Sequence, residues 1–314
     1  MARPLRIAYP GAFYHVTSRG NEQKAVFKSR RDREKFLEYL ESATQRYGAV
    51  IHAYCQMSNH YHLLLETPAG NLSQIMQHIN SAYTTYFNVK RKRSGHLFQG
   101  RYKALLVEAD EYATELSRYI HLNPVRAAMV ARPEDWPWSS YRGFIGQDRA
   151  PDWLKREFIL SYFGKKAAAE KKYRGFVEGL LNTAYESPLK DTVGTAILGS
   201  AGFVEAITAE HLTTRKAERD LPALNQFVPR PTLEEIVRAV NLVIGSDEKL
   251  ARQASMYLCH RYSGEKLRMI GKLFKVRESA ISEASRLFPR KMKKDKSLEK
   301  AIEKIKDELS ICNL

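Results

Sequence analysis

The chain has 314 residues, of which 51 are lysine or arginine and 35 are aspartate or glutamate, so its formal net charge is +16. A surplus of this size predicts a polyanionic partner, either nucleic acid or an acidic membrane surface. No apolar run approaches the length of a bilayer span, and the first residues lack the apolar core of a signal peptide. We therefore expect a cytoplasmic protein that faces DNA or RNA.

Chain length and hydrophobic content indicate a folded protein of about two domains, because 44% of the residues are hydrophobic. The cysteines are few and far apart: Cys55, Cys259 and Cys312 form no CxxC pair. Their spacing excludes a cysteine-rich zinc module and indicates reduced thiols.

Strand and helix patterns alternate along the first part of the chain. Strands are predicted at 12–18, 48–57, 59–66 and 100–108, and helices at 31–46, at 71–89, and from Asp110 as N-cap to about Asn123, where Pro124 ends the helix. The order β-α-β-β-α-β-α is typical of a split, mainly antiparallel sheet with helices packed on it, the ferredoxin-like arrangement. We therefore expect an α+β domain over residues 1–145, closed by a Trp- and Pro-rich cap at 131–144.

The remainder of the chain is predicted to be helical. Residues 146–230 form a helical extension that ends in a linker with two prolines at 225–232. Residues 231–314 have helical periodicity and end in a tail that is first basic and then amphipathic. We expect an all-α domain with a helix-turn-helix over 231–314.

The segment MSNHYHLLLETP (57–68) carries two histidines on one predicted strand. His60 and His62 are two residues apart, so they project from the same face, and Tyr61 points the other way. Two imidazoles side by side suit a divalent metal. The spacing is short and common by chance, and the alternative is a pair of partly buried histidines with local hydrogen bonds.

A tyrosine and an asparagine lie on one line of the helix predicted in ELSRYIHLNPVRA (115–127). Tyr119 and Asn123 are four residues apart, beside an apolar stripe that contains Leu116 and Ile120 and would face the sheet. Both polar side chains would then reach the strand of the histidines. The alternative is that Tyr119 is a packing residue and Asn123 a C-terminal helix cap.

The chemistry of phosphodiester cleavage gives a reason to assign the histidine pair and the Tyr119–Asn123 pair to one site. A phenol oxygen that attacks phosphorus in line displaces a 3′-hydroxyl, and the phosphotyrosine bond stores the energy for rejoining the strand. A metal held by neutral ligands remains a strong Lewis acid and stabilises charge on the non-bridging oxygens. His60, His62 and the amide oxygen of Asn123 form such a neutral set, and oxygen-rich completion suits Mg²⁺ or Mn²⁺.

These motifs, in this order, resemble a known family. MSNHYHLLLE followed by RYIHLNPVRA resembles the HUH single-tyrosine, IS200-like transposases. More narrowly, AFYHVTSRGN, GHLFQGRYKALLVE, YIHLNPVRA and WPWSSYRGF are similar to segments of the REP-associated tyrosine transposases, over about residues 5–145. The resemblance implies that His60 and His62 are metal ligands. It also implies that Tyr119 is the nucleophile and that Asn123 is the third ligand.

The resemblance further implies a single-stranded DNA substrate with a REP hairpin, and the segment FNVKRKRSGHLFQGRYK (87–103) agrees with single-stranded DNA in general terms. It contains no acidic residue, and its cations are Lys90, Arg91, Lys92, Arg93, Arg101 and Lys103, interleaved with Phe87, His96, Phe98 and Tyr102. Positive charge follows phosphates and rings stack on bases, although a solvated basic loop is the alternative. Arg19 and Asn21 are further candidate DNA contacts.

The segment GEKLRMIGKLFKVRESAISEASRLF (264–288) predicts two helices around a turn. The residues predicted to face inward are Leu267, Ile270, Leu273, Ile281, Ala284 and Leu287, and those predicted to face outward are Ser279, Ser282, Glu283 and Arg286. This is the helix-turn-helix pattern, whose second helix suits the major groove, although the turn has no glycine. The alternative is an ordinary helical hairpin.

The stretch LARQASMYLCHRYSGEKLRMIGKLFKVRESAISEA (250–284) is similar to the C-terminal DNA-binding domain of bacterial replication initiators of the DnaA type. By this resemblance Arg252 occupies a DNA-contacting position and Arg277 enters the recognition helix, on which Ser279 and Ser282 face outward. The initiators' Asp-His-Thr stretch is replaced by RESAIS. The resemblance therefore implies the fold but a different target sequence.

We expect a metal-dependent transposase that cleaves and rejoins single-stranded DNA through a 5′-phosphotyrosine at Tyr119, with an added domain that binds hairpin or duplex DNA. Two other classes stay open. One is a DNA-binding regulator without turnover. The other is a metal hydrolase that activates water with the histidine pair and Glu66, which lies on the same face of the strand. The resemblance favours a monomer over a dimer.

Overall fold

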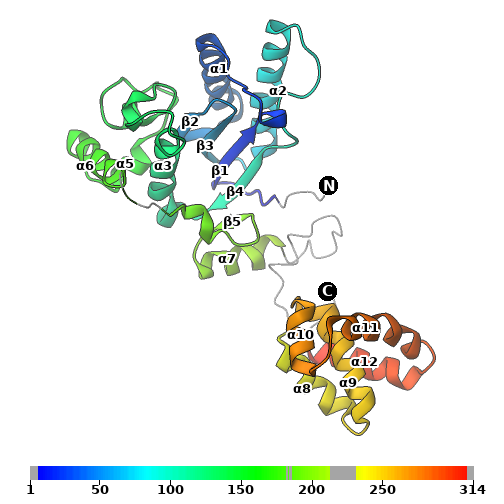
Figure 1. The fold of residues 1–314 in the computed structure, drawn as a ribbon. Helices are drawn as coiled ribbons and strands as arrows, with labels where there is room; N and C mark the ends of the chain where they lie inside the picture. The colour runs from blue at the N-terminus through cyan, green and yellow to red at the C-terminus, as the bar shows by residue number, and fades with distance from the viewer. Residues whose placement is uncertain (1–5, 182, 184–185, 213–230, 310–314) are drawn as a thin grey trace. The chain divides into compact units, whose positions relative to one another are not determined.

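The computed structural model describes residues 6–181, 183, 186–212 and 231–309 (Figure 1). These residues fall into two compact units, one that ends at Leu212 and one that covers 231–309. The part of the predicted extension from 146 to 212 therefore belongs to the same unit as the sheet. The linker predicted at 225–232 lies almost wholly outside the described residues, as does Cys312. Of the helices that the structure describes, none is both long and apolar enough to cross a membrane.

The first unit is built on a sheet of five strands. They are β1 (Ala12–Arg19), β2 (Val50–Gln56), β3 (His60–Thr67), β4 (Lys103–Val107) and β5 (Ile197–Leu198), in the order β2-β3-β1-β4-β5. The first four are antiparallel, which confirms the ferredoxin-like arrangement, and β5 joins β4 in parallel. The sequence did not predict β5 because two residues are too short to show alternation.

Helices and short turns complete this unit. The helices are α1 (Arg30–Tyr47), α2 (Leu72–Lys90), α3 (Ala109–Arg126), α4 (Tyr141–Phe144), α5 (Glu157–Ser161), α6 (Lys166–Glu178) and α7 (Ala201–Ile207). The 3-10 segments are η1 (Asn21–Gln23), η2 (Pro133–Asp135) and η3 (Pro188–Asp191), and η4 (Thr208–Leu212) is a π turn.

Both predicted ends of α3 are wrong. Glu108, not Asp110, is the N-cap residue, and the helix continues past Asn123 to Arg126 with Pro124 inside it. A proline near the end removes only one helical hydrogen bond, and the last turn is still closed by the Ala127 amide, which donates to Asn123 O at 2.9 Å. Pro124 therefore lies in the last turn without ending the helix.

The two faces of the sheet carry different helices. Figure 1 shows α1 and α2 side by side against one face, with α3, α5 and α6 on the other side. Tyr61 packs on the first face, because its ring lies 4.7 Å from that of Phe36 and its hydroxyl donates to Asn80 Oδ1 at 2.6 Å. Since strand side chains alternate, His60 and His62 face α3 instead.

The Trp-rich segment packs on the edge strand β2, as predicted for a cap. The Gln56 amide donates to Trp138 O at 2.8 Å, and Trp136 Nε1 donates to Gln56 O at 3.0 Å. The guanidinium of Arg33 lies over both indoles, 5.0 and 5.4 Å from the ring centroids of Trp136 and Trp138. The cap therefore closes the free edge of β2 with backbone bonds and buried aromatic surface.

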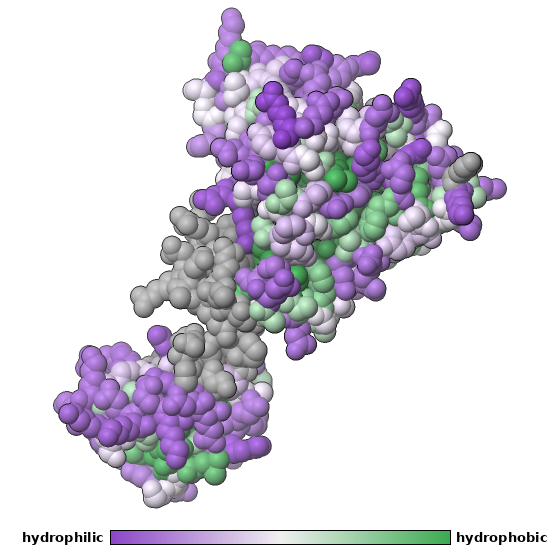
Figure 2. Space-filling view, turned by 180° about the vertical axis from the view of Figure 1, so that it is seen from behind, coloured by the Kyte–Doolittle hydropathy of each residue, from purple (hydrophilic) through white to green (hydrophobic). Residues whose placement is uncertain are grey.

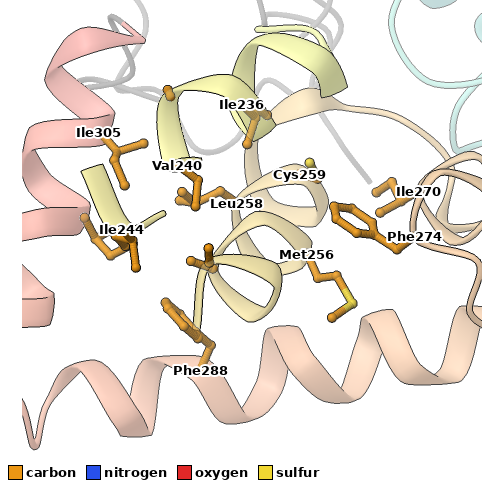
Figure 3. Close-up of a cluster of buried hydrophobic side chains, with 14 of the residues drawn as sticks. Ile236, Val240, Ile244, Met256, Leu258, Cys259, Ile270, Phe274, Phe288 and Ile305 are labelled. Atoms are coloured by element: carbon orange, nitrogen blue, oxygen red, sulfur yellow. The ribbon is translucent and has the colours of Figure 1, made fainter. Parts of the chain in front are cut away.

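The second unit is entirely helical, as predicted. Its elements are α8 (Leu233–Ile244), α9 (Glu248–Leu258), the π turn η7 (Cys259–Ser263), α10 (Leu267–Phe274), α11 (Glu278–Met292) and α12 (Lys296–Glu308). Figure 3 shows its core, in which all five helices contribute buried side chains such as Val240, Leu258, Phe274, Phe288 and Ile305.

Two of the predicted core residues of the helical pair α10–α11 are exposed. Leu273 and Leu287 are 42% and 43% exposed, and their neighbours Phe274 and Phe288 fill the core. Phe274 follows the buried Ile270 by four residues and Phe288 follows the buried Ile281 by seven, so the core stripe continues at helical spacing through the phenylalanines. The predicted outward residues Ser279, Ser282, Glu283 and Arg286 are all exposed.

A tight turn joins α10 to α11. Lys275 adopts the left-handed conformation, with φ of 52°, and the Val276 amide donates to Gly271 O at 2.9 Å. A Cβ on Gly271 would lie 2.8 Å from Val276 O, so the turn approaches the helix too closely for any larger residue. The glycine of this turn therefore lies inside α10 and not between the helices.

Candidate active site

The structure brings together His60, His62 and Tyr119, which lie on β3 and α3. The two imidazole rings are 5.0 Å apart between centroids, and the phenol ring of Tyr119 lies 5.8 Å from that of His62, edge to face. A third histidine, His15 on β1, completes the group, with its ring 5.9 Å from Tyr119. The site therefore combines two central strands and one helix.

Hydrogen bonds hold both β3 histidines through the same ring atom. His60 Nδ1 lies 2.7 Å from Asn59 Oδ1, and His62 Nδ1 lies 3.0 Å from His15 Nε2. His62 Nε2 is buried, and no hydrogen-bond partner for it exists among the described residues. Both rings therefore leave Nε2 as the atom for an outside ligand, and for His62 that atom is an unsatisfied buried nitrogen.

Burial keeps these histidines neutral. It lowers the pKa of His60 and of His15 to about 4, and the positive charge of Arg19 acts on His60 in the same direction. Burial lowers the pKa of His62 well below its ordinary value, and its neighbours His15 and His60 add to the effect. A neutral imidazole has a free lone pair, which is the form that binds metal ions.

Asn123 lies on the same helix as Tyr119 but bonds to the backbone. Its amide Nδ2 donates to Tyr119 O at 2.7 Å, so the amide oxygen is the atom that would serve a cation. Arg126, one turn further along, places its guanidinium carbon 5.2 Å from the centroid of the Tyr119 ring. The Tyr119 ring thus contacts both a cation and His62.

Glu66, the carboxylate that a metal hydrolase would need, forms a hydrogen bond with His52 instead. His52 Nε2 lies 3.0 Å from Glu66 Oε2, and His52 Nδ1 lies 2.9 Å from Lys155 O. Within the described ranges, no group of three or more His, Cys, Asp or Glu side chains is arranged to hold a metal ion. A metal at the histidine pair would therefore need an amide, water or phosphate oxygen as a further ligand.

Two cations of the basic segment pair with an acid that lies far away in the sequence. Lys90 and Arg91 form ion pairs with Asp32, at 2.7 and 2.5 Å, and Asp32 has no exposed surface. Burial alone would raise the pKa of Asp32, but hydrogen bonds from Lys90, the Lys28 amide and Arg91 lower it to about 2. These two cations are therefore already partly neutralised by the fold.

The aromatic residues of this segment do not lie open for stacking. Phe87, Phe98 and Tyr102 are buried, at 1%, 7% and 7% exposure, so the prediction that they stack on bases is wrong. Phe98 packs against Tyr61 and Tyr83, with ring centroids 5.9 and 6.3 Å apart, and so joins the core between the sheet and α2. The remaining predicted contacts on this unit are exposed: Arg19, Asn21, Lys92, Arg93, Arg101 and Lys103, and His96 is exposed as well.

The predicted DNA contacts of the second unit are also at its surface. Arg277 is the N-cap residue of α11, and Ser279 and Ser282 are exposed in its first turns. Arg252 is exposed but donates to Phe274 O at the end of α10, so it also fixes the turn. On the side shown in Figure 2 the surface of this unit is mostly hydrophilic.

Sequence reasoning missed His15 and Asn59. His15 is one polar residue in a strand whose other features are ordinary, and its role depends on the pairing of β1 with β3, which places Thr17 opposite His62. Asn59 immediately precedes β3, where the sequence predicts only a connection between two strands. A signal existed in principle, because β1 and β3 are neighbours in every ferredoxin-like sheet.

The chain is similar to a known protein family and to individual known proteins. Residues 9–123 match the family model described as transposase IS200 like, a range that includes both β3 histidines and Tyr119 and ends at Asn123. A Haemophilus influenzae protein named as a REP-associated tyrosine transposase is 25% identical over 131 residues, which cover 38% of this chain and 74% of that protein. The solved structure of a REP-associated tyrosine transposase bound to a REP hairpin is 18% identical, with a TM-score of 0.42, and the match covers 49% of this chain and 92% of that one. Residues 9–123 are therefore similar to the IS200-like transposases, and the chain is similar to a REP-associated tyrosine transposase over 131 residues.

Proposed function

We propose that the chain cleaves and rejoins single-stranded DNA next to a REP-type hairpin, with Tyr119 as the nucleophile. The observation that carries the proposal is the contact between the Tyr119 ring and His62, whose Nε2 is buried without a partner. A phenol beside an unsatisfied ligand atom is the arrangement that tyrosine attack on a metal-bound phosphate requires.

His60, His62 and Asn123 would hold the metal, through two Nε2 atoms and one amide oxygen. The donor set is neutral and incomplete, so water and a phosphate oxygen would complete the sphere, which suits Mg²⁺ or Mn²⁺. When bound, the cation would withdraw charge from the non-bridging oxygens of the phosphate as the negative charge grows. The orphaned His62 Nε2 supports this fit.

The residues of the chain perform the covalent steps. The Tyr119 oxygen bonds to phosphorus while the bond from phosphorus to the 3′-oxygen breaks, the phenol proton passes to solvent, and the leaving 3′-oxygen takes up a proton. The 5′ end then stays on Tyr119 until another 3′-hydroxyl attacks the phosphorus and releases the phenol. Arg126 lies against the Tyr119 ring and would keep the phenol in place through both steps.

The test uses labelled single-stranded DNA from the flanks of the chain's own gene, with Mg²⁺ or Mn²⁺. We expect a denaturant-resistant protein–DNA adduct that is lost in Tyr119→Phe and retained in Tyr112→Phe, a matched tyrosine on α3. Strand cleavage that persists in Tyr119→Phe would instead identify water as the nucleophile. Tight binding without cleavage by the native protein would identify a DNA-binding regulator.

We also propose that the second unit binds hairpin or duplex DNA through α11. The support is that Arg277, Ser279 and Ser282 are exposed together at the start of this helix. Loss of one phosphate contact reduces the salt dependence of binding by about one charge, without changing the sequence preference. We therefore expect Arg277→Ala to weaken hairpin binding, while Lys300→Ala, an exposed lysine on α12, leaves it unchanged; equal affinities for the two variants would contradict the assignment.

A further inference from the structure

We infer that His15 is a positioning residue: it accepts a hydrogen bond from His62 Nδ1 and so fixes the tautomer in which His62 Nε2 is free to bind a cation. The inference rests on the proposed function, because it concerns how the chain prepares one ligand for the metal. Metal-binding histidines commonly depend on such a partner for their orientation.

The contact between the two residues is close and built into the sheet. His15 Nε2 and His62 Nδ1 are 3.0 Å apart, the ring centroids are 5.2 Å apart, and the ring planes are 5° from parallel, as in an in-plane N–H···N bond between the ring edges. The side chains are only 2% and 5% exposed. Since β1 and β3 are paired, with Thr17 opposite His62, the backbone register fixes the position of His15.

The single N–H of each neutral ring determines which of the two histidines donates the hydrogen bond between His15 Nε2 and His62 Nδ1. A neutral imidazole has one N–H and one lone pair, so only one of the two facing nitrogens carries the shared proton. If His15 donated it, the proton of His62 would lie on Nε2, as a buried N–H without an acceptor, and Nε2 could not bind a cation. If His62 donates through Nδ1, its Nε2 lone pair is left free, and the proton of His15 lies on His15 Nδ1.

The partners of the two β3 histidines are both neutral. Asn59 supplies an amide oxygen to His60, and His15 supplies an imidazole nitrogen to His62, whereas the usual partner of a metal-binding histidine is a carboxylate or a backbone carbonyl. The chain does pair a strand histidine with a carboxylate elsewhere, in His52 and Glu66. Neutral partners add no negative charge near the cation, so its full charge acts on the phosphodiester anion.

The test compares three variants of the full chain. His15→Leu removes the acceptor, His15→Gln keeps an acceptor oxygen, and His52→Leu is the matched control, a buried histidine of the same sheet that is 3% exposed. Isothermal titration with Mn²⁺ measures metal affinity, and NMR of protein labelled with ¹⁵N-histidine reads the tautomer of His62 without metal. Circular dichroism and thermal unfolding check that each variant is folded.

We expect His62 to be the Nδ1–H tautomer in the native protein. We also expect His15→Leu to raise the Mn²⁺ dissociation constant about tenfold to a hundredfold, His15→Gln to restore most of the affinity, and His52→Leu to match the native protein. A native His62 protonated at Nε2, or equal affinities for His15→Leu and His52→Leu, would overturn the inference alone. If His15→Leu does not fold, the inference is tested by the His62 tautomer in the native protein and by the Mn²⁺ dissociation constants of His15→Gln and His52→Leu. A native protein that binds no Mn²⁺ would overturn the metal part of the proposed function as well.

Discussion

The phenol oxygen of Tyr173 lies 2.7 Å from Nδ1 of His121, which stands two residues beyond Tyr119 on α3. The same oxygen donates to Ser117 Oγ at 2.8 Å, and His121 Nε2 lies 2.7 Å from Ser140 Oγ. This buried chain of hydrogen bonds ties α3 to α6 on one side and to the cap on the other. The part of the first unit that lies beyond the matched residues 9–123 therefore holds the helix that carries the predicted nucleophile.

Replacing Tyr173 by phenylalanine keeps the ring but removes its hydrogen bonds to α3. We expect the free energy of unfolding of the first unit to fall by about 1–3 kcal/mol, because His121 loses a buried partner. Tryptophan fluorescence during urea unfolding measures this unit alone, since all three tryptophans, at 136, 138 and 153, lie in it. Tyr162→Phe, at an exposed tyrosine that bonds to Asp110, should have little effect. An equal loss of unfolding free energy in Tyr173→Phe and Tyr162→Phe would show that the buried hydrogen bonds of Tyr173 do not stabilise this unit more than an exposed one does.

His121 should also make the stability of this unit depend on pH. Burial lowers the pKa of His121 to about 3 from an ordinary 6.5. Between these pH values His121 binds a proton in the unfolded state but not in the folded state. Its contribution to the free energy of unfolding is therefore fully present above pH 6.5 and is lost as the pH falls toward 3. Each such histidine contributes a slope of at most about 1.4 kcal/mol per pH unit.

Unfolding in urea at pH 7 and pH 5, with a chelator present, measures this slope. The neutral histidines of the candidate site also take up protons on unfolding. The slope of the native protein should therefore correspond to the uptake of more than one proton. His121→Gln keeps a polar side chain that does not titrate, and we expect its slope to be smaller by about one proton. A slope unchanged by this substitution would mean that another group controls the acid sensitivity.

Asp32→Asn should increase non-specific binding to single-stranded DNA. The substitution removes the charge that neutralises Lys90 and Arg91, and each released cation steepens the salt dependence of binding by roughly 0.7. It should also destabilise the first unit, because two ion pairs with a buried carboxylate are lost. Asp110→Asn, the same chemical change at an exposed position, is the control for the salt slope. If the two variants bind DNA alike, Lys90 and Arg91 do not reach it.

Gly271→Ala should destabilise the second unit while leaving the first unchanged. The new Cβ would lie 2.8 Å from Val276 O, and a backbone oxygen cannot move aside without opening the turn between α10 and α11. We expect a loss of about 1–3 kcal/mol, seen as an earlier helical transition by circular dichroism with no shift in tryptophan fluorescence. Gly175→Ala, where a Cβ in α6 meets nothing within 4 Å, should be neutral or stabilising.

Local periodicity was enough to predict the core of the fold. Alternation in the strands and the helical stripe of α3 give the ferredoxin-like order, and they place His60 and His62 on one face with Tyr119 nearby. The predictions that were wrong or missing concern contacts between parts of the chain that are distant in sequence. The basic segment has no acid of its own, and Asp32 reaches it only because α1 and α2 pack together. His15 reaches His62 only through strand pairing, and the burial of Phe274 and Phe288 in place of Leu273 and Leu287 depends on how α10 and α11 pack.

The position of the histidines within the sheet has a mechanical consequence. His60 and His62 lie on β3, which is bonded on both sides, to β2 and to β1. Their backbones can move relative to each other or to that of His15 only if the centre of the sheet opens, and such regions open last. Tyr119 approaches them from a helix at the outside of the sheet. A change in the distance between Tyr119, the predicted nucleophile, and the backbone of β3 must therefore come from α3. The movable part of the candidate site is thus the helix, and the rigid part is the strand.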